Sequence, residues 1–253
     1  MKAMILAAGL GTRLRPLTND RPKALVELAG RTLLEITIAR LRAAGVTEVI
    51  VNTHHYSDLM EESLQSQKKN MRIEISPEPI LLDTGGGLKN AAWFFLKSDP
   101  VPGPESGQPF ILHNVDVLST IDLARMLRLH AEQGALGTLA LQDRPTSRYL
   151  LFDEDGHLCG RRARLTGTPE LVRSATNPQA LAFSGIHIIS PQIFSKLTET
   201  GAFSIIDAYL RLAAEGETIA AFRADEYYWR DLGRPEHIEQ AARDIAAGLY
   251  PSP

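Results

Sequence analysis

Short apolar runs alternate with helical patterns along the first part of the chain. Residues 3–7 form a continuous apolar run that ends at Gly9, which is typical of a strand buried on both faces of a parallel sheet. Apolar residues recur at helical spacing over residues 34–41, before Gly45, and residues 48–51 have the pattern of the next strand. The pattern therefore predicts a first βαβ unit.

The same alternation continues to the end of the chain. Further strands are predicted at residues 72–75, 110–112, 136–141, 181–189, 219–222 and 227–229, and helices at 57–67, 87–95, 120–130, 204–214 and 235–247. We therefore expect an α/β protein with a doubly wound, mainly parallel, Rossmann-like sheet.

Two stretches interrupt this pattern. Residues 143–178 are irregular and rich in Arg, Gly and Pro, so we expect the region 143–180 to form a small lid or a substrate-side insertion. Residues 98–109 are rich in Pro, Gly and Ser, but a predicted strand with candidate site residues follows them, so we interpret them as a surface loop. The prediction is a single domain over residues 1–253.

Composition narrows the class of protein. With 253 residues, 44% of them hydrophobic, the chain can bury one sizeable core. A net charge of -3 argues against nucleic-acid or membrane partners. The single cysteine, Cys159, excludes an internal disulfide, and the apolar N-terminal run is too short for a signal peptide. We expect a cytoplasmic protein, either a monomer or a weak homo-oligomer.

The loop after the first strand combines small residues with positive charge. The small residues that let backbone N–H groups close on a polyphosphate are Ala7, Ala8, Gly9, Gly11 and Thr12. Arg13 adds a planar fork for phosphate oxygens, and Pro22 fixes the backbone so that Lys23 can be aimed at the same group. A tight turn for the glycines and a solvated surface site for Lys23 are the alternatives.

This loop does not match the two commonest phosphate-binding motifs. Leu14 stands at the third glycine position of the dinucleotide fingerprint, and no Gly-Lys-Ser/Thr is present to make a Walker loop.

Two aspartates stand at the ends of predicted strands. Asp116 follows the strand at 110–112, and Asp231 follows the strand at 227–229. Ligands of open α/β sheets bind at the carboxyl ends of strands, where two carboxylates can hold Mg²⁺. Capping of the next helix is the alternative for each aspartate.

The motifs together resemble those of the sugar-1-phosphate nucleotidyltransferases. The resemblance rests on the Gly-Leu-Gly-Thr-Arg at 9–13, the Pro-Leu-Thr at 16–18, Pro22-Lys23 and Gly30. It implies the nucleotide-diphospho-sugar transferase fold, a loop that cradles a nucleoside triphosphate, and Arg13, Lys23 and Asp116 as catalytic residues. It also implies Mg²⁺ on Asp116 and Asp231, which match an Asn-Gly-Asp-like and a Trp-x-Asp-x-Gly-like motif. Val115 departs from the frequent glycine of the first motif, and we expect its side chain to narrow the sugar site.

Further binding residues follow from the same resemblance. Three glycines after Thr84 open a predicted helix and let the backbone approach a base or a phosphate, with a flexible helix entry as the alternative. The resemblance implies that Thr84, Gly85 and Gly86 face the nucleotide. It also implies that Asn114, Ser184 and Gly185 line the sugar pocket, although a strand glycine can simply mark a bulge.

Other polar residues carry less information. His54 and His55 lack a partner at metal-ligand spacing and are interpreted as loop histidines, and Cys159 as inert. Arg144 and Arg148 can meet the phosphate or a substituent of the sugar, and a solvated basic stretch is the equal alternative.

The implied reaction joins a nucleoside triphosphate to a sugar 1-phosphate and releases pyrophosphate. Within the family, the Thr-Gly-Gly-Gly segment and the chain length resemble the N-acetylmuramate 1-phosphate uridylyltransferases of cell-wall metabolism most, and next the mannose- or heptose-1-phosphate guanylyltransferases. A nucleotide-sugar-dependent glycosyltransferase and a non-catalytic nucleotide-sugar sensor are the alternatives from other classes. The triphosphate loop argues against the first, and the intact charged residues argue against the second.

Overall fold

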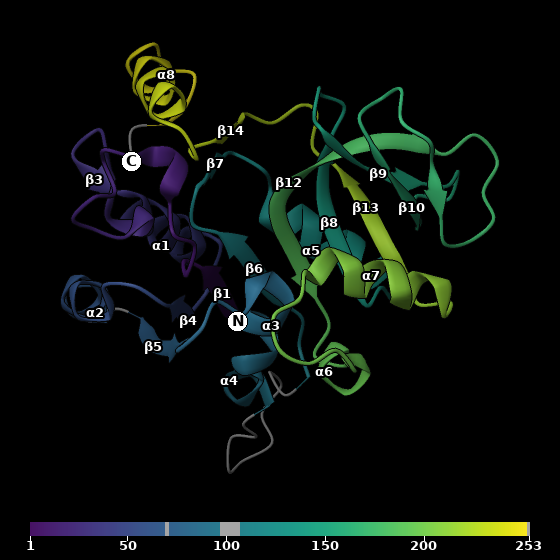
Figure 1. Ribbon diagram of the computed structural model, residues 1–253, viewed down its shortest axis with the longest axis horizontal. Helices are drawn as coiled ribbons and strands as arrows, with labels where there is room; N and C mark the ends of the chain where they lie inside the picture. Colours follow the sequence, from purple (N-terminus) through teal and green to yellow (C-terminus); the bar gives the residue numbers. More distant parts are fainter. Residues whose placement is uncertain (69–70, 97–106, 252–253) are drawn as a thin grey trace.

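A computed structural model describes residues 1–68, 71–96 and 107–251, and its centre is a large twisted sheet (Figure 1). The strands of this sheet in the described residues are β1 (Lys2–Leu6), β4 (Glu48–Thr53), β5 (Arg72–Pro77), β6 (Phe110–Asn114), β8 (Gly137–Gln142), β9 (Arg148–Phe152), β10 (Leu158–Ala163), β11 (Glu170–Leu171), β12 (Gln179–Ile189) and β13 (Ile219–Arg223). The path through the sheet runs β11-β10-β9-β12-β6-β1-β4-β5, with β8 and β13 joined beside β12.

The sheet has a parallel and an antiparallel part. β6, β1, β4 and β5 pair in parallel, as the βαβ pattern predicts. From β12 onward, the pairs β12–β6, β12–β8, β12–β9 and β9–β10 are antiparallel. The α/β fold is confirmed, and β12 marks the boundary at which the strand direction changes.

Helices cover both faces of the sheet. They are α1 (Leu33–Ala43), α2 (Ser57–Gln65), α3 (Asp83–Asn90), α4 (Ala92–Leu96), α5 (Leu123–Glu132), α6 (Ile193–Lys196), α7 (Ile205–Ala214) and α8 (Pro235–Ala246). Alternate residues of β1 enter two separate cores, Ala3 and Ile5 on one face and Met4 on the other. This double burial explains why the strand is continuously apolar. In the described part of the chain, no helix combines the length and apolar character that crossing a bilayer requires.

Two small ribbons complete the fold. β2 (Glu27–Leu28) pairs with β3 (Arg31–Thr32), and β7 (Val117–Ser119) pairs antiparallel with β14 (Trp229–Asp231). The second ribbon joins segments that lie more than a hundred residues apart in sequence and brings the C-terminal part back beside the end of β6 (Figure 1).

The region predicted to be irregular is instead ordered. Residues 143–178 contain β9, β10 and β11, which extend the large sheet at the edge opposite β5 (Figure 1). The prediction of irregular structure was wrong for these strands, because strand pairing, not local periodicity, orders them. That the region forms a lid or a substrate-side insertion stays a prediction. The predicted helix at 120–130 begins later, at Leu123, since Asp122 caps it through the backbone N–H of Arg125. Most of the surface loop predicted at 98–109 lies outside the described residues.

Candidate functional site

The loop after β1 is held by contacts from three directions. The backbone N–H of Ala7 donates to Asn52 Oδ1 at 2.7 Å, and the hydroxyl of Thr18 donates to the carbonyl of Gly11 at 2.9 Å. Gly11 has a φ of 63°, and a Cβ there would lie 3.0 Å from the Cβ of Lys23. A Cβ on Gly9 would meet nothing within 4 Å, so Gly9 borders open space. Gly11 is thus required by the turn, and Gly9 leaves room.

Lys23 and Asp116 form an ion pair across the site. Pro22 is extended and precedes a short 3₁₀ turn, Lys23–Leu25, which directs Lys23 toward the end of β6. The ammonium of Lys23 binds Oδ2 of Asp116, and the two side chains are 12% and 16% exposed, so solvent screens the pair only weakly.

The two predicted metal ligands lie on neighbouring backbone segments. Asp231 is opposite Val117 in the β7–β14 ribbon, and the N–H of Leu232 donates to the carbonyl of Asp116 at 2.8 Å. Arg13 approaches the same place, because a Cβ on Gly233 would lie 3.1 Å from Arg13 Nη2 and 2.8 Å from Asp231 Oδ1. The structure therefore brings Arg13, Lys23, Asp116 and Asp231 to one place, although Asp231 is far from the others in sequence.

A cavity of about 460 Å³ lies on the side of the parallel strands. Its lining includes Ala7, Ala8, Gly9, Lys23, Asn52, Glu78, Thr84, Asn114, Val115 and Asp116. Gly11 and Thr12 do not line this cavity, and their role in binding the nucleotide stays a prediction. Val115 is 3% exposed and lines this smaller cavity, and a narrowing of the sugar site by its side chain stays a prediction.

A buried polar network shapes this first cavity. Asn52 Nδ2 donates to Glu78 Oε1 at 2.8 Å, and the N–H of Leu82 donates to Glu78 Oε2 at 3.0 Å. A Cβ on Gly87 would lie 2.6 Å from Glu78 Oε1, so glycine is needed there. The sequence analysis missed Asn52 and Glu78, yet both stand at the carboxyl ends of parallel strands, the rule that identified Asp116.

The glycines after Thr84 lie inside α3, which begins at Asp83 and not at the predicted residue 87. The N–H groups of Gly85 and Gly86 both donate to the carbonyl of Phe203, and a Cβ on Gly85 would lie 2.3 Å from the Phe203 ring. These contacts give Gly85 and Gly86 a packing role, and their approach to a base or a phosphate stays a prediction. The two glycines allow α3 to pack on the segment before α7, while Thr84 lines the cavity.

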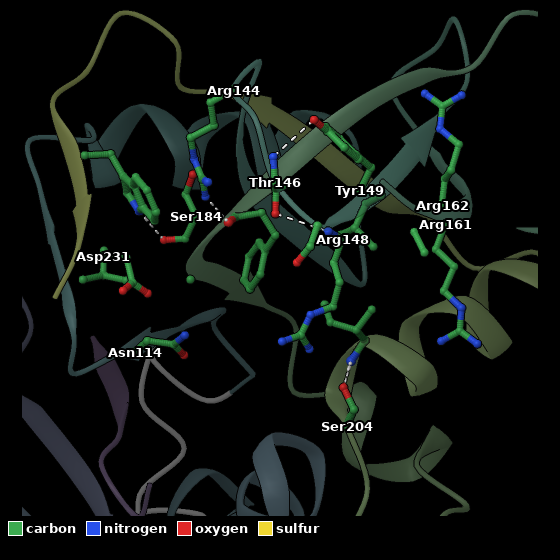
Figure 2. A pocket seen from close by; sticks show the side chains of 18 of the residues that line it. Asn114, Arg144, Thr146, Arg148, Tyr149, Arg161, Arg162, Ser184, Ser204 and Asp231 are labelled. Carbon is green, nitrogen blue, oxygen red and sulfur yellow. Dashed lines mark hydrogen bonds between the residues drawn. The ribbon is translucent and has the colours of Figure 1, made fainter. Parts of the chain in front are cut away.

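A larger cavity of about 950 Å³ lies on the side of the antiparallel strands (Figure 2). Asn114, Ser184, Gly185, Asp231 and Arg13 are among its lining residues. Asn114 lines both cavities, so the two meet beside it. The predicted sugar-pocket residues are therefore brought together at this junction.

The wall of the larger cavity is built around Gly185, Ser184 and Trp229. Gly185 has a φ of 76°, and a Cβ there would lie 2.9 Å from Asn114 Nδ2. Trp229 Nε1 donates to the carbonyl of Ser184 at 2.8 Å, and the Arg144 guanidinium stacks 3.6 Å from the centre of the Trp229 ring. Burial lowers the pKa of Arg144. The Ser184 hydroxyl and Arg144 Nε are buried without a hydrogen-bond partner among the described residues, and both residues line the cavity.

The remaining candidates have structural explanations. His54 Nδ1 contacts the carbonyl of Glu78 at 2.8 Å, and burial raises the pKa of the Cys159 thiol to about 11. Asp153, Asp155 and His157 are close enough to hold a metal ion, but they form the β9–β10 turn. Asp153 Oδ1 accepts from the backbone N–H groups of the other two at 3.1 and 2.8 Å, which accounts for the cluster.

Comparison with known proteins agrees with this geometry. The profile of a family described as "Nucleotidyl transferase" matches residues 2–248. N-acetylmuramate alpha-1-phosphate uridylyltransferase of Caulobacter vibrioides is 36% identical and is aligned over 92% of each chain. Mannose-1-phosphate guanyltransferase beta-B of Xenopus laevis is 30% identical over 93% of this chain and 62% of its own length. The structure of HddC from Yersinia pseudotuberculosis, complexed with GMP-PN, superposes with a TM-score of 0.73 over 96% of this chain and 99% of its own, at 23% identity.

Proposed function

Because the chain belongs to the nucleotidyl transferase family and is a sugar-1-phosphate nucleotidyltransferase, we propose that it transfers a uridylyl group from UTP to N-acetylmuramate 1-phosphate with Mg²⁺. The observation that carries this proposal is the meeting of two cavities beside Asn114, where Arg13, Lys23, Asp116 and Asp231 converge. The smaller cavity takes the nucleotide, and the larger takes the acceptor sugar. The product is a cytoplasmic precursor of cell-wall synthesis.

The reaction needs alignment and charge neutralisation more than proton transfer. A phosphate oxygen of the acceptor attacks the α-phosphorus of UTP, a new P–O bond forms, and the bond to the β-phosphate breaks with its electrons leaving on pyrophosphate. The attacking oxygen is already anionic near neutral pH, so no general base is required. Arg13 and Lys23 hold the polyphosphate and offset the charge of the transition state. The Lys23–Asp116 pair must rearrange when the ammonium engages phosphate oxygens.

The carboxylates of Asp116 and Asp231 fit a magnesium site. They are hard oxygen donors on adjacent segments, and both remain partly exposed, at 16% and 36% of their side-chain areas. When bound, Mg²⁺ neutralises phosphate charge and orients the phosphates for in-line displacement. Gly233 fixes the orientation of Asp231 by donating its backbone N–H to Oδ1 at 2.8 Å.

Pyrophosphate release tests the substrate pair. We would measure it with Mg²⁺ across UTP, GTP, dTTP and ATP, each combined with the 1-phosphates of N-acetylmuramate, mannose, heptose and glucose. The proposal expects release that needs UTP together with N-acetylmuramate 1-phosphate. Release of pyrophosphate only with GTP and mannose or heptose 1-phosphate would identify a guanylyltransferase instead. If folded protein released no pyrophosphate with any substrate pair, nucleotidyl transfer would be contradicted.

A further inference from the structure

Positive charge exceeds negative charge in the acceptor cavity. Six arginines and three carboxylates line it: Arg13, Arg144, Arg148, Arg161, Arg162 and Arg230, against Glu170, Asp207 and Asp231. A neutral hexose carrying a 1-phosphate would need cations at its phosphate end alone. The arginines instead continue along β9 and β10, away from that end (Figure 2).

Two of these six arginines are already engaged in ion pairs. Arg161 binds Glu170 at 2.7 Å and Asp207 at 2.6 Å, and Arg230 binds Asp244 at 2.6 Å. These contacts neutralise both guanidinium groups within the protein.

Two other arginines belong to the phosphate end of the cavity. Arg144 stacks on Trp229 and interacts electrostatically with Asp231, while Arg13 lies beside Gly233. Both are therefore placed to meet the 1-phosphate or the triphosphate.

Arg148 differs from these four. It begins β9, it is exposed, and its side chain has no hydrogen bond or ion pair with any residue that the structure describes. Arg162 lies opposite Tyr149 in the β9–β10 pair, so it shares the face of Tyr149, and Arg148 lies on the other face. Figure 2 shows the guanidinium groups of Arg148 and Arg162 pointing to opposite sides.

The face that carries Arg148 looks toward the N-terminal end of α7. Arg161 shares this face, because it lies opposite Leu150, and it reaches Asp207 of α7. Ser204, which caps α7, lines the same cavity. A sugar whose phosphate lies at Asp231 would therefore present its ring substituents to Arg148.

We propose that Arg148 binds a carboxylate carried on the ring of the acceptor sugar and so selects an acidic sugar 1-phosphate over a neutral one. This inference rests on the proposed function, because it assigns the acceptor to the larger cavity. The guanidinium matches a carboxylate through two parallel N–H···O bonds, which a neutral substituent cannot accept in the same way.

The test combines a protein variant with a substrate variant. Pyrophosphate release from UTP would be measured with N-acetylmuramate 1-phosphate and with its carboxamide, in which the carboxylate is replaced by a neutral amide. We expect Arg148→Gln to lower kcat/KM for the acid by roughly ten- to a hundred-fold, mostly through KM, and to leave the amide within about twofold. Arg164→Gln removes an arginine of the same hairpin that does not line the cavity, and should change neither substrate's kcat/KM.

The outcomes separate this inference from the proposed function. Equal loss on both acceptors, or no loss on the acid, would overturn the role of Arg148 while leaving uridylyl transfer intact. A wild-type protein with equal kcat/KM for the acid and the amide would also overturn the role of Arg148 and leave uridylyl transfer intact. A wild-type protein that releases no pyrophosphate with either acceptor would overturn the proposed function itself.

Discussion

The nucleotide cavity and the acceptor cavity differ in how far their polar groups are satisfied within the protein. On the parallel side, Ala7, Asn52, Glu78 and Leu82 form a closed hydrogen-bond network. On the antiparallel side, the Ser184 hydroxyl and Arg144 Nε are buried without partners in the described residues. The first cavity is therefore shaped by its own contacts, whereas the second has polar groups left for a ligand. We therefore expect the choice of acceptor to depend on the second cavity, while Arg13, Lys23, Asp116 and Asp231 converge where the two cavities meet.

The largest effect is expected at the junction of the two cavities. Asp116→Asn removes the charge that pairs with Lys23 and that, in our proposal, binds Mg²⁺, so we expect kcat to fall by about 10²–10³-fold or more, with the fold unchanged. Steady-state kinetics over a Mg²⁺ titration, with circular dichroism melting as the check on folding, would measure this. Asp153→Asn changes an aspartate of the β9–β10 turn and should retain wild-type kcat. Near-normal turnover by Asp116→Asn would contradict the metal assignment.

The next effect concerns acid stability, and it originates in three buried histidines on β6, α5 and β12, near the boundary between the two parts of the sheet. Burial lowers the pKa of His113 and of His187 to about 3, and that of His130 to about 4. Below pH 6.5 these three histidines therefore bind protons in the unfolded chain but stay neutral in the folded protein. The free energy of unfolding falls as pH falls. Each histidine contributes a slope of about 1.4 kcal/mol per pH unit below its unfolded pKa.

Urea unfolding between pH 7 and pH 5 measures this slope. Carboxylates whose pKa is lowered, such as Asp244, act below this window. His130→Gln should reduce the slope by one proton, and a stability that does not change from pH 7 to pH 5 would contradict the account.

A smaller effect separates two glycines on the nucleotide side. Gly85→Ala places a methyl group against the Phe203 ring, and we expect it to lower the free energy of unfolding by about 1–3 kcal/mol. Gly9→Ala meets no atom within 4 Å, so its melting temperature should stay at the wild-type value while KM for the nucleotide rises. Melting curves and KM measurements on both variants would show whether Gly85→Ala loses stability and Gly9→Ala loses affinity for the nucleotide. Equal melting temperatures would show that α3 does not need the glycine.

The smallest effect is expected in the wall of the acceptor cavity. Trp229→Phe removes the hydrogen bond to the carbonyl of Ser184 but keeps an aromatic ring for Arg144, which predicts a loss of about 0.5–1.5 kcal/mol of stability. KM for the acceptor should rise and KM for UTP should stay constant. A rise in KM for UTP alone would contradict the placement of Trp229 in the acceptor cavity.

The sequence predicts the nucleotide side better than the acceptor side, for a physical reason. The strand before Gly9 and the sites of Lys23 and Asp116 follow from local signals, namely apolar runs, a proline, and polar residues at strand ends. The meeting of Asp116 with Asp231 depends on the β7–β14 pairing between distant segments. No local pattern specifies such a pairing; the position of both aspartates at strand ends made their meeting a possibility, and the resemblance to a known family favoured it.

On the acceptor side, the important residues lie in a segment whose structure has no local sequence pattern. Residues 143–178 lack periodicity, yet β9 and β10 pair there and place Arg148 and Arg162 on opposite faces. Which arginine meets a ligand depends on strand register, and register comes from the packing of the whole sheet.

An isotope experiment tests the central claim, that the acceptor's phosphate attacks the α-phosphorus of UTP at this junction. The protein would be incubated with Mg²⁺, UTP and N-acetylmuramate 1-phosphate whose phosphate oxygens carry ¹⁸O, and the products would be separated and weighed by mass spectrometry. The account predicts that all of the label is in the UDP-sugar and none in pyrophosphate. Label in pyrophosphate, or pyrophosphate release without a UDP-sugar, would contradict it.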